Sequence, residues 1–198
     1  MQGVLQADEW LFRVVNAHHA PWLDWPLWVA SQHWSWIVVV LAMGGMVMWD
    51  CRARSLRRGW WVYPIAVALC FLLADRLSVW CFKEVFCRPR PCHTLEGVHM
   101  FRTRCGGAYG FVSSHAANAT AVVLLTSLVL RRYRLKFHVN HTRLYAVLAW
   151  LWCGVVCYSR VYLGKHYPGD VIGGALLGVA VGALCYAIWL RITDRVEA

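Results

Sequence analysis

The sequence predicts an all-α membrane protein: a polytopic helical bundle of about five transmembrane helices with an N-terminal interfacial helix. Two observations predict this class. Hydrophobic residues make up 60% of the 198 residues and charged residues only 15%, so the chain is far more apolar than a soluble domain needs to be. Several apolar runs also approach the roughly 20 residues that a helix needs to cross a bilayer. We therefore expect residues 1–198 to form a single membrane-embedded domain.

The first expected element is a short amphipathic helix. Residues 7–18 place Trp10, Val14 and Ala17 on one side at helical spacing, but they are too few to cross a bilayer. Such a helix lies in the membrane interface. Apolar runs of spanning length follow it, with polar loops between them. We expect the spans at about Leu27–Trp49, Trp60–Phe82, from near Ser113 to just before Arg131, Leu144–Tyr158 and Pro168–Leu190.

The basic residues lie in the loops between these runs. An odd number of spans puts the two termini on opposite sides, and loops 52–58 and 131–143 then share a side with Arg191 and Arg195. Because short cytoplasmic loops carry an excess of Lys and Arg, we expect this side to be cytoplasmic and the N-terminus to be outside. The net charge of +10 is spread over loops instead of forming one face, so nucleic acid is not an expected partner.

Three glycines in the last expected span share one helical face. Gly174, Gly178 and Gly182 are spaced four residues apart. Small residues in this pattern let two membrane helices approach closely. We therefore expect this face to pack against another span.

Polar segments that are far apart in the sequence meet on the outer face under this topology. They are residues 83–91, 112–115 and 159–170. Together they offer several fixed cations, hydroxyl groups at a helix start, two histidines and one carboxylate. This combination is what an anionic phosphate ester undergoing substitution requires.

The cations are the first part of this candidate site. Arg90 and Arg160 each present a planar fork of donors to two phosphate oxygens, and Lys83 adds a compact charge. Together they can bind the phosphate and stabilise the charge of the transition state. The alternative for any one of them is snorkelling to lipid headgroups at the bilayer edge.

The third expected span opens with Ser113, Ser114 and His115. Ser113 suits the N-cap position, and the unpaired N–H groups of the first turn would then point toward an anion. An ordinary capped helix has the same pattern, so this segment is a weak signal by itself. Beside those amides, His115 can act as the general acid that protonates the leaving oxygen.

His166 and Asp170 are four residues apart at the start of the fifth expected span, where Pro168 suits the first helical position. The carboxylate can therefore approach one imidazole nitrogen and hold its tautomer. The other nitrogen is then free to attack phosphorus. A histidine nucleophile divides hydrolysis into a phosphohistidine step and a water step.

These residues resemble the motifs of the type 2 phosphatidic acid phosphatase family. The first motif, Lys-x6-Arg-Pro, is complete as Lys83, Arg90 and Pro91. The third, Ser-Arg-x5-His-x3-Asp, is complete as Ser159, Arg160, His166 and Asp170. The second, Pro-Ser-Gly-His, is kept in part, with its Pro and Gly replaced, as Val112, Ser113, Ser114 and His115.

The resemblance covers about residues 83–174 and implies a role for each matched residue. His166 would be the nucleophile, Asp170 its partner and His115 the acid. The phosphate would be bound by Lys83, Arg90, Ser113, Ser114 and Arg160. The family also implies catalysis without a metal or other cofactor, at a site that faces the periplasm from a bacterial inner membrane.

A zinc hydrolase is an alternative for the histidines. Candidate ligands in these segments are His93, His99, His115, His166 and Asp170. The neighbouring Lys and Arg residues oppose this interpretation, because a site ringed by cations attracts anions and repels a divalent metal. We therefore expect no metal site.

The outer loop contains Cys92 and Cys105. In an oxidising periplasm they can form a disulfide, which would contribute roughly 3 kcal/mol by closing a loop of this size. Two free thiols are the alternative. In either case Cys87 would stay unpaired.

Asp75 and Arg76 lie inside the second expected span. Intramembrane charge is by default a sign of function, with a packing role as the alternative. Adjacent residues of a helix do not face each other, so each of the two must find a different partner.

The expected function is hydrolysis of a lipid phosphate or diphosphate, with the headgroup in the outer pocket and the tail in the bilayer between spans. In the resembled family the first candidate substrates are undecaprenyl diphosphate and the phosphates of lipid A. Phosphatidylglycerol phosphate and phosphatidic acid come next, and the sequence does not choose among them.

Three other functions share parts of this pattern. Soluble vanadium haloperoxidases carry the same motifs, but the many spans argue against that activity. A lipid phosphotransferase would pass the phosphate to another lipid instead of water. A non-enzymatic anion or lipid transporter would line a path through the bilayer with its charges, whereas the motif residues here cluster at one face.

Overall fold

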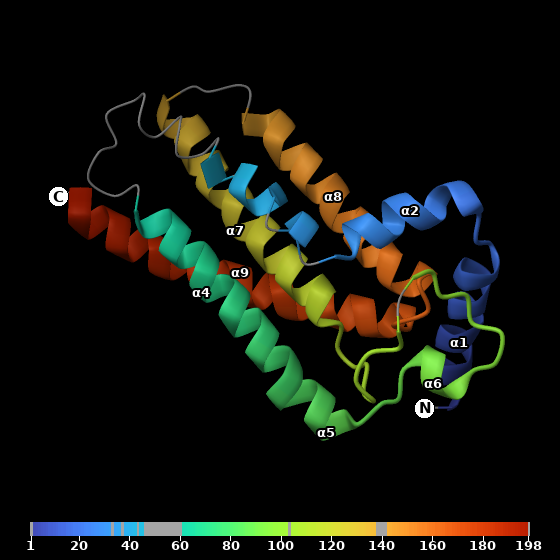
Figure 1. Ribbon diagram of the computed structural model, residues 1–198. Helices are drawn as coiled ribbons and strands as arrows, with labels where there is room; N and C mark the ends of the chain where they lie inside the picture. The colour runs from blue at the N-terminus through green and yellow to red at the C-terminus, as the bar shows by residue number, and fades with distance from the viewer. Residues whose placement is uncertain are drawn as a thin grey trace.

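The computed structural model describes residues 2–32, 34–36, 38–42, 44–45, 61–102, 104–137 and 142–197. Within them the chain is a bundle of long helices with short helices and loops at one end (Figure 1). The long helices are α4 (Val62–Leu77), α7 (Ser114–Phe137), α8 (Thr142–Tyr162) and α9 (Pro168–Glu197). α4 continues through a π-helical segment, η1 (Ser78–Lys83), into α5 (Glu84–Phe86). The short helices are α1 (Gln2–Ala17), α2 (Pro21–Ala30) and α6 (Pro91–Thr94).

The predicted all-α class is confirmed. Over the described ranges the only β pairing is an isolated bridge between Pro89 and Tyr109. The N-terminus lies at the end of the bundle with α1 and α6, and the C-terminus lies at the opposite end (Figure 1). The expected placement of the two termini on opposite sides therefore agrees with the structure.

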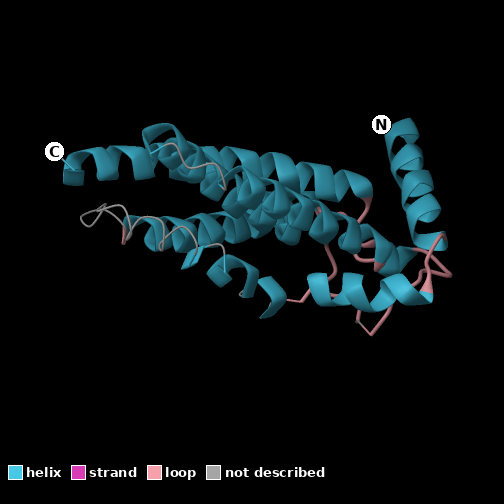
Figure 2. Ribbon diagram, turned by 90° about the horizontal axis from the view of Figure 1, so that it is seen from above, coloured by secondary structure: helices cyan, strands magenta, loops and turns pink. Residues whose placement is uncertain are grey.

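α1 crosses the end of the bundle instead of running along it (Figure 2). Its outward side exposes large apolar residues such as Val4 and Trp10, while Phe12 and Asn16 on the inward side are buried. A helix with an apolar outer face in this position matches the expected interfacial helix. It begins earlier than expected, at Gln2.

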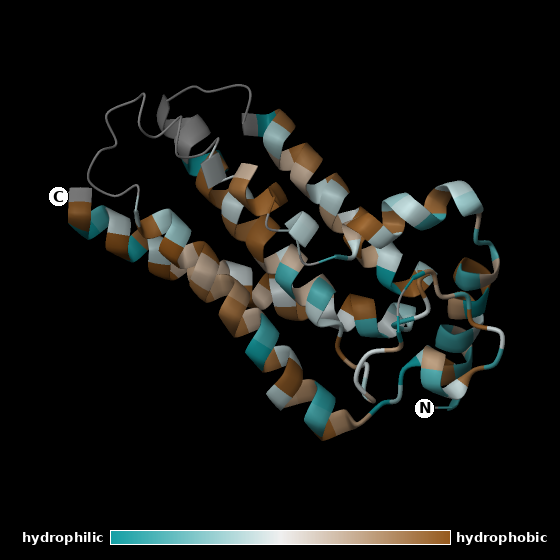
Figure 3. Cartoon of the chain, viewed as in Figure 1, coloured by the Kyte–Doolittle hydropathy of each residue, from teal (hydrophilic) through white to brown (hydrophobic). Residues whose placement is uncertain are grey.

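Apolar residues predominate along the middle of the bundle, and polar residues gather toward its ends (Figure 3). Among the described residues, three helices are long and apolar enough to cross a membrane: Val62–Phe86, Arg143–Tyr162 and Pro168–Val196. Their outward side chains, such as Ile65, Leu151 and Leu176, are exposed and apolar. These helices correspond to the second, fourth and fifth expected spans, and the chain is a membrane protein.

α7, the third expected span, is the buried centre of the bundle and packs against α4, α8 and α9. Its end was predicted before Arg131, but the helix continues to Phe137. The helix therefore extends beyond the apolar run from which the span was predicted. Arg132 of this extension pairs with Asp194 of α9 and lies over the ring of Trp189, with 6.0 Å between Cζ and the ring centroid.

The first expected span was predicted to begin at Leu27, and this start is also wrong. α2 ends at Ala30, a turn follows at residues 31–32, and helical residues resume at Trp34. The turn is stabilised because the indole Nε1 of Trp36 donates to the Ala30 carbonyl at 3.2 Å. Residues 46–60, which contain the end of this span and the basic loop 52–58, lie outside the described residues.

The glycines of α9 lie against the backbone of α7, as their spacing predicted. A Cβ atom on Gly174 would be 2.4 Å from the Ser113 carbonyl oxygen, and one on Gly178 would be 2.5 Å from that of Ala117. Gly182 meets the next turn of α7 in the same way, at 2.7 Å from the Ala121 oxygen. The two helices are therefore in backbone contact over three turns.

We expect Gly178→Ala to lower stability by about 1–3 kcal/mol, because the new methyl group overlaps the Ala117 carbonyl. The matched control is Gly154→Ala in α8, where nothing lies within 4 Å of an added Cβ. That change should raise stability by roughly 0.5–1 kcal/mol through helix propensity. The thermal midpoint of purified protein in detergent measures both, and equal shifts would contradict the close contact.

Candidate active site

The three segments expected to converge meet at the end of the bundle that carries α1 and α6. Lys83 is the last residue of the π-helical segment, and its Nζ donates to Ser114 Oγ at 2.5 Å. The hydroxyl of Ser78, at the start of the same segment, lies 2.6 Å from that oxygen. Because the hydrogen bonds of a π-helix join residues five apart, Ser78 and Lys83 lie on the same side, and both contact the first turn of α7.

Ser113 joins the starts of α7 and α9. Its backbone N–H donates to the Asp170 carbonyl at 2.9 Å, and its own carbonyl accepts from Ala117 N at 3.0 Å. Its hydroxyl lies 3.5 Å from Ala116 N, which places it at the N-cap position as expected. The positive end of the α7 dipole therefore lies at this site.

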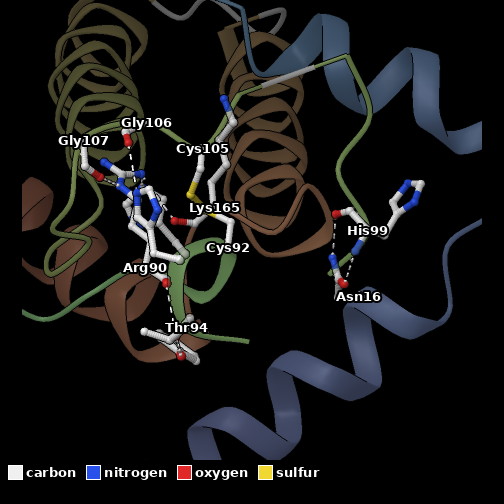
Figure 4. The surroundings of a disulfide bond; sticks show 12 residues. Asn16, Arg90, Cys92, Thr94, His99, Cys105, Gly106, Gly107 and Lys165 are labelled. Carbon is white, nitrogen blue, oxygen red and sulfur yellow. Dashed lines mark hydrogen bonds between the residues drawn. A yellow bond between two sulfur atoms is a disulfide. The ribbon is translucent and has the colours of Figure 1, made fainter. Parts of the chain in front are cut away.

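Arg90 is held in place by main-chain carbonyls. Its Nε donates to Gly107 O at 2.7 Å, and its Nη1 donates to Lys165 O at 3.3 Å (Figure 4). The same Nη1 lies 3.1 Å from His166 Nε2. With only 8% of its surface exposed, the guanidinium is fixed before any substrate binds.

His166 and Asp170 are fully enclosed at the start of α9. Asp170 Oδ2 accepts from the backbone N–H of Tyr167 at 3.0 Å and lies 3.5 Å from His166 Nδ1. Because Arg90 can only donate, His166 Nε2 must be an acceptor, so the proton of the neutral ring is on Nδ1. The carboxylate therefore faces the N–H of the ring, and the Nε2 lone pair faces the cations.

The electrostatics of the site favour the neutral form of this ring. Burial, and then the charges of Arg90 and Arg160, hold the pKa of His166 well below its usual range. The charges of Lys83 and His115 act on the pKa of His166 in the same direction. A neutral imidazole, which keeps a lone pair on Nε2, is the form that can attack phosphorus.

Arg160 is almost completely buried, and its Nη1 donates to Ser31 Oγ at the end of α2. Its Nε has no acceptor within the described part of the chain. Lys165 is a further cation beside it that the sequence analysis did not select. Burial, together with the charges of Arg160 and Arg90, lowers the pKa of Lys165 to about 8.

The other histidines considered as zinc ligands have separate partners. His93 Nε2 lies 3.2 Å from Gly106 O, and His99 Nε2 lies 2.8 Å from Asp24 Oδ1. The ring of His115 contacts the edge of Trp36, with 5.5 Å between centroids. Among the described residues, no group of three His, Cys, Asp or Glu side chains is arranged to hold a metal ion.

A disulfide joins Cys92 of α6 to Cys105 in the outer loop, with 5.8 Å between the Cα atoms (Figure 4). The residues that follow Cys105 carry the Gly107 carbonyl that binds Arg90. The disulfide therefore helps to hold this loop against the site. Cys87 is a free, exposed cysteine, as expected.

Of the charged pair in the second expected span, Arg76 has a side-chain contact and Asp75 a backbone contact. The guanidinium of Arg76 lies over the ring of Trp80, with 5.7 Å between Cζ and the centroid. The backbone carbonyl of Asp75 accepts from Ser78 Oγ at 2.7 Å. Neither side chain contacts the His–Asp pair in these interactions.

Several residues of the site were missed by the sequence analysis. Ser78 gave no signal, because the π-helical register cannot be read from an apolar run. Gly110 packs against the His–Asp pair: an added Cβ would lie 3.0 Å from Asp170 Oδ2 and 3.6 Å from His166 Nδ1. Asp8 and Arg88 fell within the ranges 7–18 and 83–91, but neither was selected as a site residue. Their spacing in the sequence gives no reason to place them beside Asp170.

Fixed cations, a helix N-terminus and a buried His–Asp pair at one end of a membrane bundle define a hydrolase of phosphoric esters. The family model of the PAP2 superfamily matches residues 59–194, and the chain belongs to that superfamily. The predicted family is thus confirmed, and the chain is a membrane lipid phosphatase.

Relatives with assigned activities support this class. The chain is 30% identical to a lipid A 4'-phosphatase of Porphyromonas gingivalis over 198 residues, covering 98% of this chain and 78% of the relative. It is 29% identical to a lipid A 4'-phosphatase of Bacteroides thetaiotaomicron, covering 82% and 74%. The fold resembles that of a transmembrane PAP2 type phosphatidylglycerolphosphate phosphatase from Bacillus subtilis, with a TM-score of 0.70, 22% identity, and coverage of 97% and 89%.

We expect Gly110→Ala to lower kcat/KM by about 10- to 100-fold, because the added methyl group would push the Asp170 carboxylate away from His166. Gly107→Ala is the matched control in the same loop, since a Cβ there has nothing within 4 Å. Phosphate release from a lipid phosphate measures both variants. Equal activities would mean that the packing at residue 110 does not position the pair.

Proposed function

We propose that the protein hydrolyses a lipid phosphate at the periplasmic face of a bacterial inner membrane through a phosphohistidine intermediate. The observation that carries this proposal is the orientation of His166. Its Nδ1 faces Asp170, and its Nε2 lies 3.1 Å from Arg90, where a phosphate would bind. The nucleophilic lone pair and the cations thus face the same space.

In the first step the Nε2 lone pair of His166 attacks phosphorus and forms an N–P bond. The bond between phosphorus and the leaving oxygen breaks, and His115 donates a proton to that oxygen. Asp170 stabilises the positive charge that develops on the ring. Arg90, Arg160 and Lys83, with the amides at the start of α7, stabilise the charge on the transferring phosphoryl group.

In the second step water attacks the phosphohistidine. His115, which has lost its proton, accepts one from the water as the new O–P bond forms. The N–P bond breaks, and its electron pair returns to Nε2. Inorganic phosphate leaves, and both histidines regain their starting protonation.

An apolar cavity of about 800 Å³ supports a lipid substrate. It lies between α4, α7 and a third side formed by Trp36, Val40, Leu41, Gly44 and Gly45, and its lining also includes Phe71 and Val122. Trp36 also contacts the ring of His115, so the cavity begins next to the site. A hydrocarbon tail in this cavity would keep its phosphate at the cations.

Lipid A phosphate is the substrate we propose first, because two relatives are lipid A 4'-phosphatases. Undecaprenyl diphosphate is the second candidate, since its long prenyl tail suits the same apolar cavity. A phosphotransferase would use the same first step with a lipid as acceptor. A transporter would need its charges along a path through the bundle, whereas these are gathered at one end.

The periplasmic orientation is supported by the disulfide. Disulfides form and persist in oxidising compartments such as the periplasm. The Cys92–Cys105 bond lies at the same end of the bundle as the candidate site. The C-terminus, with Arg191 and Arg195, lies at the opposite end, which the positive-inside rule assigns to the cytoplasm.

Phosphate release tests the function directly. We expect the purified protein to release phosphate from lipid A or undecaprenyl diphosphate in the presence of EDTA, and His166→Ala to lose this activity by about 1,000-fold or more. His18→Ala is the control, because His18 is exposed just after α1 and its Nδ1 lies 2.6 Å from the Val14 carbonyl oxygen. Equal release by wild type and His166→Ala would refute the mechanism. A phosphorylated lipid in place of free phosphate would indicate transfer.

The protonation of His166 can be measured separately. Because burial and the neighbouring cations hold the pKa of His166 well below its usual value of about 6.5, the ring should be neutral at pH 7 and should take up a proton only at a pH well below that usual value. Side-chain 15N NMR of histidine-labelled protein, assigned with His166→Gln, reports both charge and tautomer. We expect the Nδ1–H tautomer. A ring already charged at pH 7 would contradict the proposed nucleophile.

A further inference from the structure

Arg88 stands outside the family motifs, two residues before Arg90, yet it contacts the other end of the His–Asp pair. Its Nη1 donates to Asp170 Oδ1 at 2.9 Å, while Arg90 Nη1 lies 3.1 Å from His166 Nε2. The backbone around Arg88 is fixed, because its carbonyl accepts from Gly110 N at 2.8 Å. The two arginines therefore contact the His–Asp pair at opposite ends.

The second half of the Arg88 fork binds α1. Its Nη2 donates to Asp8 Oδ2 at 2.7 Å, and the guanidinium lies over the ring of Tyr167, with 4.1 Å between Cζ and the centroid. The other oxygen of Asp8 accepts from the backbone N–H of Gly169 at 2.7 Å, in the first turn of α9. Asp8 thus holds both Arg88 and the helix start that carries Asp170.

We propose that Arg88, held by Asp8, is a positioning residue for the hydrolysis, and that α1 is therefore part of the active site as well as an interfacial helix. The inference rests on the proposed roles of Asp170 and His166. Arg88 does not act on the substrate. It fixes the carboxylate that orients the nucleophile.

The two oxygens of Asp170 explain why the carboxylate needs this partner. Oδ1 is bound by Arg88, and Oδ2 is bound by the Tyr167 N–H and faces His166 Nδ1. A side chain with no exposed surface cannot replace a lost partner with bulk water. Without Arg88, rotation of the carboxylate to find another donor would move Oδ2 away from the imidazole.

α1 is packed firmly enough to present Asp8 in one position. Phe12 is 1% exposed and lies edge-on to Tyr167, with 5.5 Å between centroids. Asn16 donates to the carbonyls of Tyr162 and His99 and accepts from the His99 N–H. Asp8 lies about one turn before Phe12 on the same side of the helix, so the packing of these residues fixes the ion pair.

The test compares kcat and KM of Arg88→Ala, Arg88→Lys and Asp8→Asn with wild type and with His166→Ala. The matched control is Arg13→Ala. This variant also removes an arginine ion pair of α1, but the pair is the exposed one with Glu9 and does not involve Asp170. Each kinetic measurement uses the substrate that the wild type hydrolyses and is repeated with added guanidinium chloride. The thermal midpoint of each variant shows whether it is folded.

We expect Arg88→Ala to lower kcat by about 10- to 100-fold with little change in KM, because binding by the phosphate cations is retained. Added guanidinium should restore part of the kcat that Arg88→Ala loses. It should restore no activity to His166→Ala. Asp8→Asn should lower kcat less, and Arg88→Lys should be intermediate because a single ammonium cannot join both carboxylates. Arg13→Ala should match the wild type.

Wild-type kcat in both Arg88→Ala and Asp8→Asn would overturn the inference and leave the proposed function intact. Loss of activity without guanidinium rescue, together with a lower thermal midpoint, would show a structural role and would also overturn it. If Arg88→Ala does not fold, Asp8→Asn and Arg88→Lys decide the question by the same kcat criterion. Equal activity of wild type and His166→Ala would instead refute the proposed function on which the inference rests.

Discussion

The close contact between α7 and α9 is the constraint on which the rest of the structure depends. Three glycines of α9 let its backbone lie directly against that of α7. At the outer end of this contact, Ser113 N–H bonds the Asp170 carbonyl, so the starts of the two helices are held together. One start carries Ser114 and His115, and the other carries Asp170. The distance between these groups is therefore set by the packing of the bundle and not by loops.

Burying the charged side chains of the site costs free energy unless each of them has hydrogen-bond partners. Arg90 is satisfied by backbone carbonyls of two loops, and Lys83 by the hydroxyl of Ser114. These partners fix the cations without neutralising them, so their charge stays available to an anion. The same cations keep His166 neutral. A single arrangement thus gathers cations that can bind an anionic phosphate and keeps the imidazole in the form that the proposed mechanism needs.

Much of the fold and site was predictable because it depends on local patterns. The apolar runs identify α4, α8 and α9, the glycine spacing identifies the packing face of α9, and the motif residues lie together as expected. The ends of helices and the breaks between them were harder to predict from the sequence. The continuation of α7 to Phe137 and the turn after Ala30 depend on contacts with α9 and with Trp36, which the apolar pattern does not encode.

The sequence by itself determined the membrane class, the convergence of three segments on one face and the identity of the motif residues, because periodicity, length and charge act along the chain. Only the tertiary structure decided which groups outside the motifs contact them. Asp8 and Asp170 are separated by 162 positions, and Arg88 joins them only because α1 crosses the end of the bundle. Ser78 and Lys83, five residues apart, both reach Ser114 because they are the two ends of a π-helical segment. Such contacts arise from packing, which no local pattern specifies.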